Sequence, residues 1–225
     1  MAERAASPAC RVIVVGGHTR SIGKTQLVCD LLARLPEARF IAGKITQYGH
    51  GVCAQNGEHC GCAPDEHSSA FSWESDALSG TDSARFLAAG ARRAFWLRTK
   101  QGYLAEGMPL LRRALEEATG EKDGSALNLI IESNSLLQFL KPSVYLAVLD
   151  PEKRDFKPTA QSLVDRADAF VLRHNFRQAR QSWPQVSLKL LESKQTFLQA
   201  ENEALPEPLL DMVRNVLARA APVRI

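Results

Sequence analysis

The chain has 225 residues, of which 45% are apolar and 24% charged, and its net charge is +3 at pH 7. This length suits one α/β domain with a full core, and so small a charge, with basic residues scattered along the chain, argues against a nucleic-acid or membrane-surface partner. No apolar run approaches the ~20 residues of a membrane helix, and the first ten residues lack the apolar core of a signal peptide, so we expect a cytoplasmic protein.

Short apolar runs alternate with helical patterns along the chain. The runs predict buried strands at 11–15, 38–46, 93–99, 127–133, 143–150, 167–175 and 185–190. Helical patterns run over 24–35, over the stretch between Thr81 and Gly90, and over 106–119 and 206–220. This alternation predicts a three-layer α/β fold, with helices on both faces of a mostly parallel sheet. We expect a single domain over 1–225, in which the aperiodic residues 47–79 form an insertion at one edge.

The segment VIVVGGHTRSIGKTQLV, residues 12–28, joins the first predicted strand to the first predicted helix. A strand, a glycine-rich turn, Lys-Thr and a helix form the context of a phosphate loop, in which backbone amides and the helix dipole bind phosphate. Lys24 would reach the β and γ phosphates, Thr25 would bind Mg²⁺ through its hydroxyl, and Gly23 would let the backbone approach closely. The predicted nucleotide-binding residues are Gly17, His18, Thr19, Arg20, Ser21, Ile22, Gly23, Lys24, Thr25 and Gln26.

Two features of this loop are unusual. His18 stands where the common G-x-x-x-x-G-K-[ST] motif has its first glycine, and five residues rather than four separate Gly17 from Gly23. His18 either contacts the nucleotide or a partner, or is a polar residue of the turn. Arg20 either adds charge against a γ phosphate or points to solvent.

Two acidic residues are candidates for the magnesium site. Glu132 ends a predicted buried strand, and ligands of such sheets bind outside the carboxyl ends of the strands. It could order Mg²⁺ through water or orient an attacking water, or it could be a surface carboxylate. Asp82 opens a predicted helix, where it is either a Mg²⁺ or substrate contact or only a favourable N-terminal charge.

The loop spacing and the segment AGKITQYGHG (42–51) resemble dethiobiotin synthetase. The segments at 80–99 and 127–135 resemble the molybdopterin-guanine dinucleotide biosynthesis adaptor, although Thr81 replaces a lysine and Ser133 a glycine of that pattern. Together the resemblances cover about residues 11–150 and imply a P-loop protein of the group that also includes nickel-enzyme maturation GTPases. They imply a homodimer, and they place Lys44 near phosphate and a substrate carboxylate.

The sequence does not decide whether the nucleotide is ATP or GTP. Asn175 matches an asparagine that contacts the base in related proteins, but the Asn-Lys-x-Asp guanine motif is absent, because Phe176, Arg177 and Gln178 follow it. Asn175 could instead stabilise a turn. We favour ATP over GTP.

Residues 48–71 contain three of the five cysteines and three of the five histidines. Thiolate and imidazole are ligands that Zn²⁺ prefers, usually four in a tetrahedron. Three ligands would be Cys53, Cys60 and Cys62, with His67, His59 or His50 as the fourth. The alternatives are an iron–sulfur cluster, a nickel or copper ion, a redox switch, or a polar loop with reduced thiols. A bound metal would be structural or a cargo.

These patterns predict a Mg²⁺-dependent nucleoside triphosphatase with a metal-binding insertion, acting in cofactor or metalloenzyme maturation. Lys24, Glu132 and Lys44 would carry the catalysis by electrostatic stabilisation. One alternative is an ATP-dependent carboxylate ligase or kinase of the dethiobiotin-synthetase type. The other is a nucleotide-gated adaptor or metallochaperone that binds a cofactor-making or metalloenzyme partner.

Overall fold

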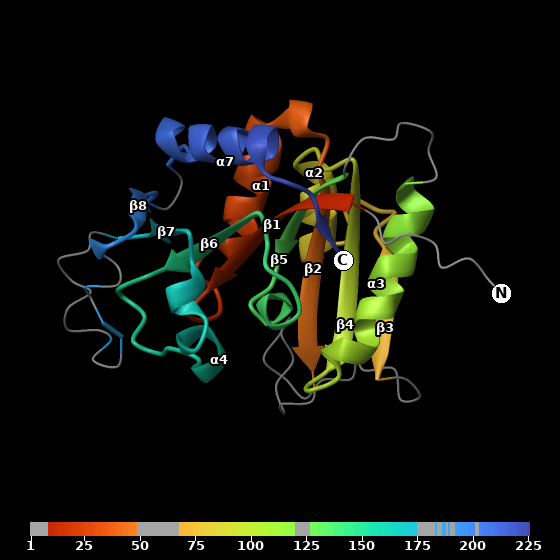
Figure 1. Ribbon diagram of the computed structural model, residues 1–225, viewed down its shortest axis with the longest axis horizontal. Helices are drawn as coiled ribbons and strands as arrows, with labels where there is room; N and C mark the ends of the chain where they lie inside the picture. The colour runs from red at the N-terminus through yellow and green to blue at the C-terminus, as the bar shows by residue number, and fades with distance from the viewer. Residues whose placement is uncertain are drawn as a thin grey trace.

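One twisted sheet runs through the molecule. The structure, a computed structural model, describes residues 9–48, 68–119, 127–174, 192–200 and 203–225, together with Trp183, Val186, Ser187 and Lys189. Its strands follow the order β3-β4-β2-β5-β1-β6-β7-β8, with β9 paired to the start of β1 (Figure 1). The strand bounds are Ala9–Gly17 (β1), Ile41–Tyr48 (β2), Ser69–Trp73 (β3), Arg93–Lys100 (β4), Leu127–Glu132 (β5), Val144–Leu149 (β6), Ala169–Leu172 (β7), Gln195–Leu198 (β8) and Val223–Arg224 (β9). All pairs are parallel except β3 with β4 and β9 with β1, which confirms the predicted mostly parallel sheet.

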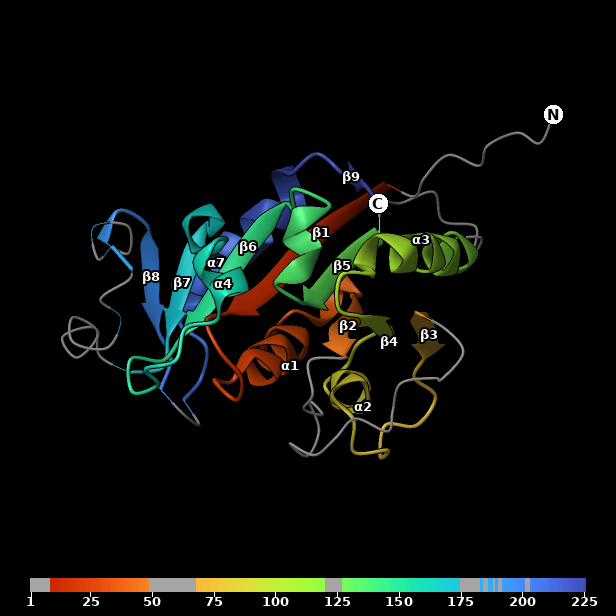
Figure 2. The same ribbon diagram turned by 90° about the horizontal axis from the view of Figure 1, so that it is seen from below.

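Helices cover both faces of the sheet, as predicted. The α-helices of the described residues are Lys24–Arg34 (α1), Asp82–Ala88 (α2), Leu104–Thr119 (α3), Pro158–Gln161 (α4) and Glu207–Arg219 (α7). Short 3₁₀ turns lie at Pro36–Ala38 (η1), Ser135–Gln138 (η2) and Val164–Arg166 (η3). In Figure 2, α1 and α2 lie on one side of the sheet and α3 on the other.

The two faces form two separate cores because strand side chains alternate in direction. Ile13 and Val15 of β1 pack with α1, α2 and α7, whereas Val12 and Val14 pack with α3, η2 and η3. All four side chains are fully buried. This explains why the central strands appear in the sequence as continuous apolar runs.

The helix ends follow local sequence rules. The Thr81 hydroxyl accepts a hydrogen bond from the Ala84 amide at 3.0 Å, which is the cap predicted for α2. Gly90 follows α2 with φ 101°, a backbone conformation that favours glycine. Pro36 begins η1 just after α1, as expected of a residue that cannot continue a helix.

The sheet edges differ from the sequence prediction. The strand predicted at 185–190 is wrong, since Val186 and Ser187 lie outside strands and Lys189 is helical. The strand beside β7 is β8, in which only Phe197 is buried, so it lacks the apolar pattern of an internal strand. At the other edge, the predicted aperiodic segment 47–79 contains β3, whose five residues are all only partly buried.

The parallel strands bring several loops to one edge of the sheet. β1 lies between β5 and β6, with Val15 opposite Glu132, and Glu132 is also opposite Lys44 of β2. The loop after β1, the end of β5 and the middle of β2 are therefore neighbours. Such an edge, outside the carboxyl ends of the strands, is where sheets of this type bind ligands. Among the described residues, no helix is both long and apolar enough to cross a membrane.

Candidate functional site

The loop between β1 and α1 wraps around the N-terminus of α1. Gly23 is the N-cap residue with φ 81°, and no side chain of the described residues makes a cap hydrogen bond, which leaves the first amides of the helix facing a ligand. A Cβ at Gly23 would lie only 2.6 Å from the Arg173 guanidinium, so the position requires glycine on two grounds. Ser21 also has a left-handed φ of 51°. An uncapped helix start with a tight glycine turn is an anion-binding geometry.

Arg173, which follows β7, fixes the direction of the loop peptides. Its side chain is buried, and the guanidinium donates to the carbonyls of Ile22 (3.1 Å) and Gly23 and to the Gln199 Oε1 (2.8 Å). In a trans peptide the N–H points opposite to the C=O. The amides of Gly23 and Lys24 therefore point away from Arg173, toward the ligand side of the loop. The sequence offered no signal for this role, because it depends on a contact 150 residues away in the chain.

The start of the loop is bound within the protein. The Asn134 side chain accepts from the Gly17 amide at 2.9 Å and donates to the Gly17 carbonyl at 2.8 Å. The His18 amide donates to the Val148 carbonyl at 3.4 Å. These two amides are thus engaged within the protein, although the sequence predicted Gly17 and His18 among the nucleotide-binding residues.

The His18 side chain is a structural group. Its ring is only 1% exposed and packs against the rings of Phe156 and Trp183. Nδ1 donates to the Asp155 carbonyl at 2.9 Å, and Nε2 accepts from the Asp150 amide at 3.1 Å. Burial lowers the pKa of His18, which keeps the ring neutral with one donor and one acceptor. Both ring nitrogens are thus engaged within the protein. It anchors the loop to the segment after β6.

Lys24 lies under the loop. Its ammonium donates to the Thr19 carbonyl at 2.6 Å. Burial lowers the pKa of Lys24 to about 8, and the positive charges of Lys44 and Lys157 add to this, although the Glu132 carboxylate opposes it. Burial and then the Arg20 charge likewise lower the pKa of Lys157. Basic groups this close suit a polyanion, which would stabilise all of their charges.

Four side chains converge beside the loop and the start of α1. Thr25 donates its hydroxyl to Glu132 Oε2 at 2.7 Å, and Lys44 Nζ lies 2.6 Å from Glu132 Oε1 and 2.8 Å from Asp82 Oδ2. Glu132 is 3% exposed. Burial alone would lower the pKa of Lys44 and raise that of Asp82, but their mutual attraction outweighs it. The pKa of Lys44 is raised and that of Asp82 lowered.

This donor set fits Mg²⁺. A threonine hydroxyl and two carboxylates are hard oxygen ligands, and they sit next to the helix start that would bind the phosphates. As the sequence suggested, the fold brings together Glu132 at the end of β5, Thr25 after the loop lysine, and Asp82 at the start of α2. The functional assignment of these residues stays a prediction.

The remaining loop residues contact the protein or solvent. Arg20 is exposed, while Gln26 donates to Asp30 at 2.7 Å and accepts from Arg85 at 2.9 Å. Thr19 donates its hydroxyl to the Asp155 carboxylate. Other sequence predictions fall outside the described residues: Asn175, and the ligand set Cys53, Cys60, Cys62 and His67 with its alternatives His59 and His50.

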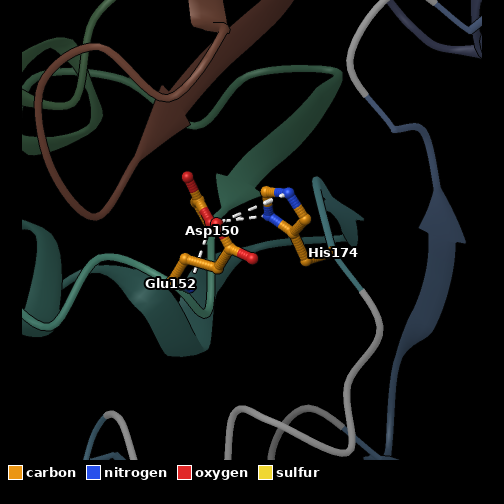
Figure 3. A group of neighbouring side chains, drawn as sticks. All are labelled: Asp150, Glu152 and His174. Carbon is orange, nitrogen blue, oxygen red and sulfur yellow. Dashed lines mark hydrogen bonds and ion pairs between the residues drawn. The ribbon is translucent and has the colours of Figure 1, made fainter.

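A second polar group lies where β6 and β7 end (Figure 3). His174 Nδ1 is 2.9 Å from Asp150 Oδ1, and His174 Nε2 is 3.7 Å from Glu152 Oε2. Possible ligand atoms of the three residues lie within 4.8 Å of one another. With His174 protonated, the arrangement is an ordinary ion pair with Asp150. The sequence did not suggest this group, because His174 lies 24 residues beyond Asp150 in the chain.

Comparison with known proteins agrees with the geometry. No family model and no curated protein matches the chain. Among solved structures, the crystal structure of HypB from Helicobacter pylori in complex with nickel matches with a TM-score of 0.54 and 15% sequence identity. The match covers 96% of this chain and 90% of that chain. The resemblance to dethiobiotin synthetase and to the molybdopterin-guanine dinucleotide adaptor stays a prediction. The likeness to HypB shows the fold alone, and this chain is an α/β protein with a mostly parallel sheet covered by helices on both faces.

Proposed function

We propose that this protein binds and hydrolyses a nucleoside triphosphate with Mg²⁺ at the loop between β1 and α1. The observation that carries the proposal is the convergence of an uncapped helix start, the Lys24 ammonium and the Thr25–Glu132 pair at one edge of the sheet. Each of these groups suits a different part of a magnesium–triphosphate complex. The P-loop fold shared with HypB supports it.

The residues have separate roles in this proposal. The amides from Thr19 to Gln26 and the Lys24 ammonium bind the phosphates. Thr25, Glu132 and Asp82 would hold Mg²⁺, which neutralises phosphate charge when it is bound. The Glu132 carboxylate orients the attacking water, and Lys44 stabilises charge on the substrate side. The protein stabilises the transition state by placing fixed charges and dipoles around it.

We further propose that hydrolysis serves the maturation of a metalloenzyme or cofactor, and that Cys53, Cys60, Cys62 and His67 bind a metal, with zinc favoured. The chain leaves β2 at Tyr48 and returns at Ser69, and these residues pair with Lys100 and Thr99 at the end of β4. Both ends of the intervening segment are therefore at the edge that carries the phosphate loop. HypB, which shares the fold, was crystallised with nickel.

The nucleotide proposal is tested by calorimetry and phosphate release. Purified protein should bind Mg·ATP or Mg·GTP, and Lys24→Ala should lose measurable binding while keeping its circular dichroism spectrum. Equal affinity of the two proteins would refute the assignment of the loop. Comparing the two nucleotides identifies the base, where we favour ATP.

Three further measurements address the other parts of the proposal. Phosphate released without any organic acid argues against a ligase of the dethiobiotin-synthetase type. Elemental analysis should find about one metal per chain and less in a Cys60→Ser/Cys62→Ser variant; metal-free, folded protein would refute the metal site. Light scattering tests the homodimer that the resemblance implies.

A further inference from the structure

The Lys44 ammonium lies between the two carboxylates of the candidate magnesium site. It is 2.6 Å from Glu132 Oε1 and 2.8 Å from Asp82 Oδ2, and its side chain is only 16% exposed. The three groups come from β2, β5 and α2, so the tertiary fold brings them together. Lys44 and Glu132 are also direct partners in the parallel register. Their contact is therefore fixed by the backbone as well as by charge.

The same oxygens are the ones that a divalent cation would use. Glu132 offers one oxygen to Lys44 and the other to the Thr25 hydroxyl at 2.7 Å, so both of its oxygens are engaged. Asp82 offers Oδ2 to the same ammonium. A Mg²⁺ ion needs oxygen ligands at about 2.0–2.1 Å. An ammonium held 2.6–2.8 Å from those oxygens competes with the ion for their lone pairs and repels it.

We infer that Lys44 is a built-in counter-ion of the magnesium site, which offsets part of the negative charge of Glu132 and Asp82 in the nucleotide-free protein and moves away when a magnesium–triphosphate complex binds. The inference rests on the proposed function. Without nucleotide, Lys44 offsets half of the charge of the two carboxylates and occupies their oxygens, so Mg²⁺ alone gains little by binding. With nucleotide, the phosphates offer the ammonium a new anionic partner at the same edge of the sheet. The site therefore takes metal and triphosphate together.

The test measures the response of the protein to MgCl₂ alone. Thermal unfolding is followed at constant ionic strength, set with KCl, for wild type and for Lys44→Met. Removal of the ammonium leaves two carboxylates facing each other, so Lys44→Met should melt below wild type without Mg²⁺. Its midpoint should then rise saturably with MgCl₂, by several degrees, whereas the wild-type midpoint should change no more than a matched control.

The matched control is Lys100→Met. Lys100 lies on β4, is exposed, and stacks on Tyr103, so this variant loses the same charge outside the site. A further variant, Lys44→Met/Asp82→Asn, should need at least tenfold more MgCl₂ for the same rise, because one ligand is lost. A wild-type response equal to that of Lys44→Met, or no response in Lys44→Met, would overturn the inference.

A second measurement covers the case in which Lys44→Met does not fold. Wild-type lysines are dimethylated with ¹³C, and the Lys44 resonance is identified by its absence in Lys44→Arg. The resonance should stay in place with MgCl₂ alone and shift when MgCl₂ and a non-hydrolysable triphosphate are added together. An unmoved resonance in protein shown by calorimetry to hold the triphosphate contradicts the inference alone. Failure of the triphosphate to bind contradicts the proposed function instead.

Discussion

Replacing Arg173 with methionine should weaken both the fold and the phosphate loop. The buried guanidinium donates to the carbonyls of Ile22 and Gly23 and to the Gln199 side chain. Hydrogen bonds to charged groups contribute about 1.5–3 kcal/mol each, and methionine regains part of the loss by apolar packing, so we expect a loss of about 3 kcal/mol. For a chain of this size that corresponds to a midpoint lower by about 6–12 °C.

The effect on binding follows from the peptide geometry. Without Arg173, the Ile22 carbonyl loses its described partner, whereas the Gly23 carbonyl still accepts from the Leu27 amide at 2.9 Å. The amide of Gly23, which shares a peptide with the Ile22 carbonyl, then loses its fixed direction, and triphosphate affinity should fall about tenfold, or about 1.4 kcal/mol. Calorimetry on folded protein at low temperature measures this separately from stability.

A matched substitution separates this role from loss of any arginine. Arg214 lies on α7, its side chain is 41% exposed, and it pairs with Asp211 at 3.0 Å and Glu207 at 3.9 Å. Arg214→Met should cost at most about 1 kcal/mol, as is usual for surface ion pairs, and leave binding unchanged. If Arg173→Met behaves like Arg214→Met in both assays, Arg173 does not orient the loop.

Three further predictions concern the loop. Gly23→Ala should reduce the free energy of unfolding by about 1–3 kcal/mol in urea denaturation, because φ is 81° and the new Cβ meets Arg173; an unchanged value would contradict the strained geometry. Since burial lowers the pKa of Lys24 to about 8, triphosphate affinity should fall by up to about tenfold per pH unit above that value. The free energy of unfolding should meanwhile rise between about pH 8 and 10.5, because there the unfolded chain binds the proton that the folded chain has released; Lys24→Met should not show this rise. The lowered pKa of His18 predicts that stability falls as the pH drops below 6.5, since only the unfolded chain takes up the proton readily, and a melting series from pH 7 to 5 should show a smaller fall in His18→Gln.

Much of the sheet could be predicted because its central strands are buried on both faces. Runs such as 127–133 and 143–150 are mostly apolar, and the observed strands β5 and β6 lie within them. The strands at the two edges of the sheet have no such apolar pattern. In β8 only Phe197 is buried, and Val186 contributes to the core from outside a strand, so apolar periodicity located the strand in the wrong place.

The candidate site was predictable to the extent that strand ends meet at one edge. Glu132 and Lys44 followed from that rule and from resemblance, and the structure places them 2.6 Å apart. The supports of the loop did not follow, since Arg173 and Asn134 act through contacts more than 100 residues away in the chain. His18, a polar residue in a glycine-rich turn, carried no sign in the sequence that its ring would be buried.

The packing of Trp183 on His18 gives the loop a natural optical label. The ring centroids are 4.8 Å apart, and the indole N–H donates to the Lys153 carbonyl at 2.8 Å, while the Lys153 ammonium donates to the Ser21 carbonyl at 2.6 Å. A ligand that shifts the loop must therefore alter the surroundings of this indole. In a variant with the other two tryptophans replaced by phenylalanine, its emission would follow loop occupancy in real time, without any dye.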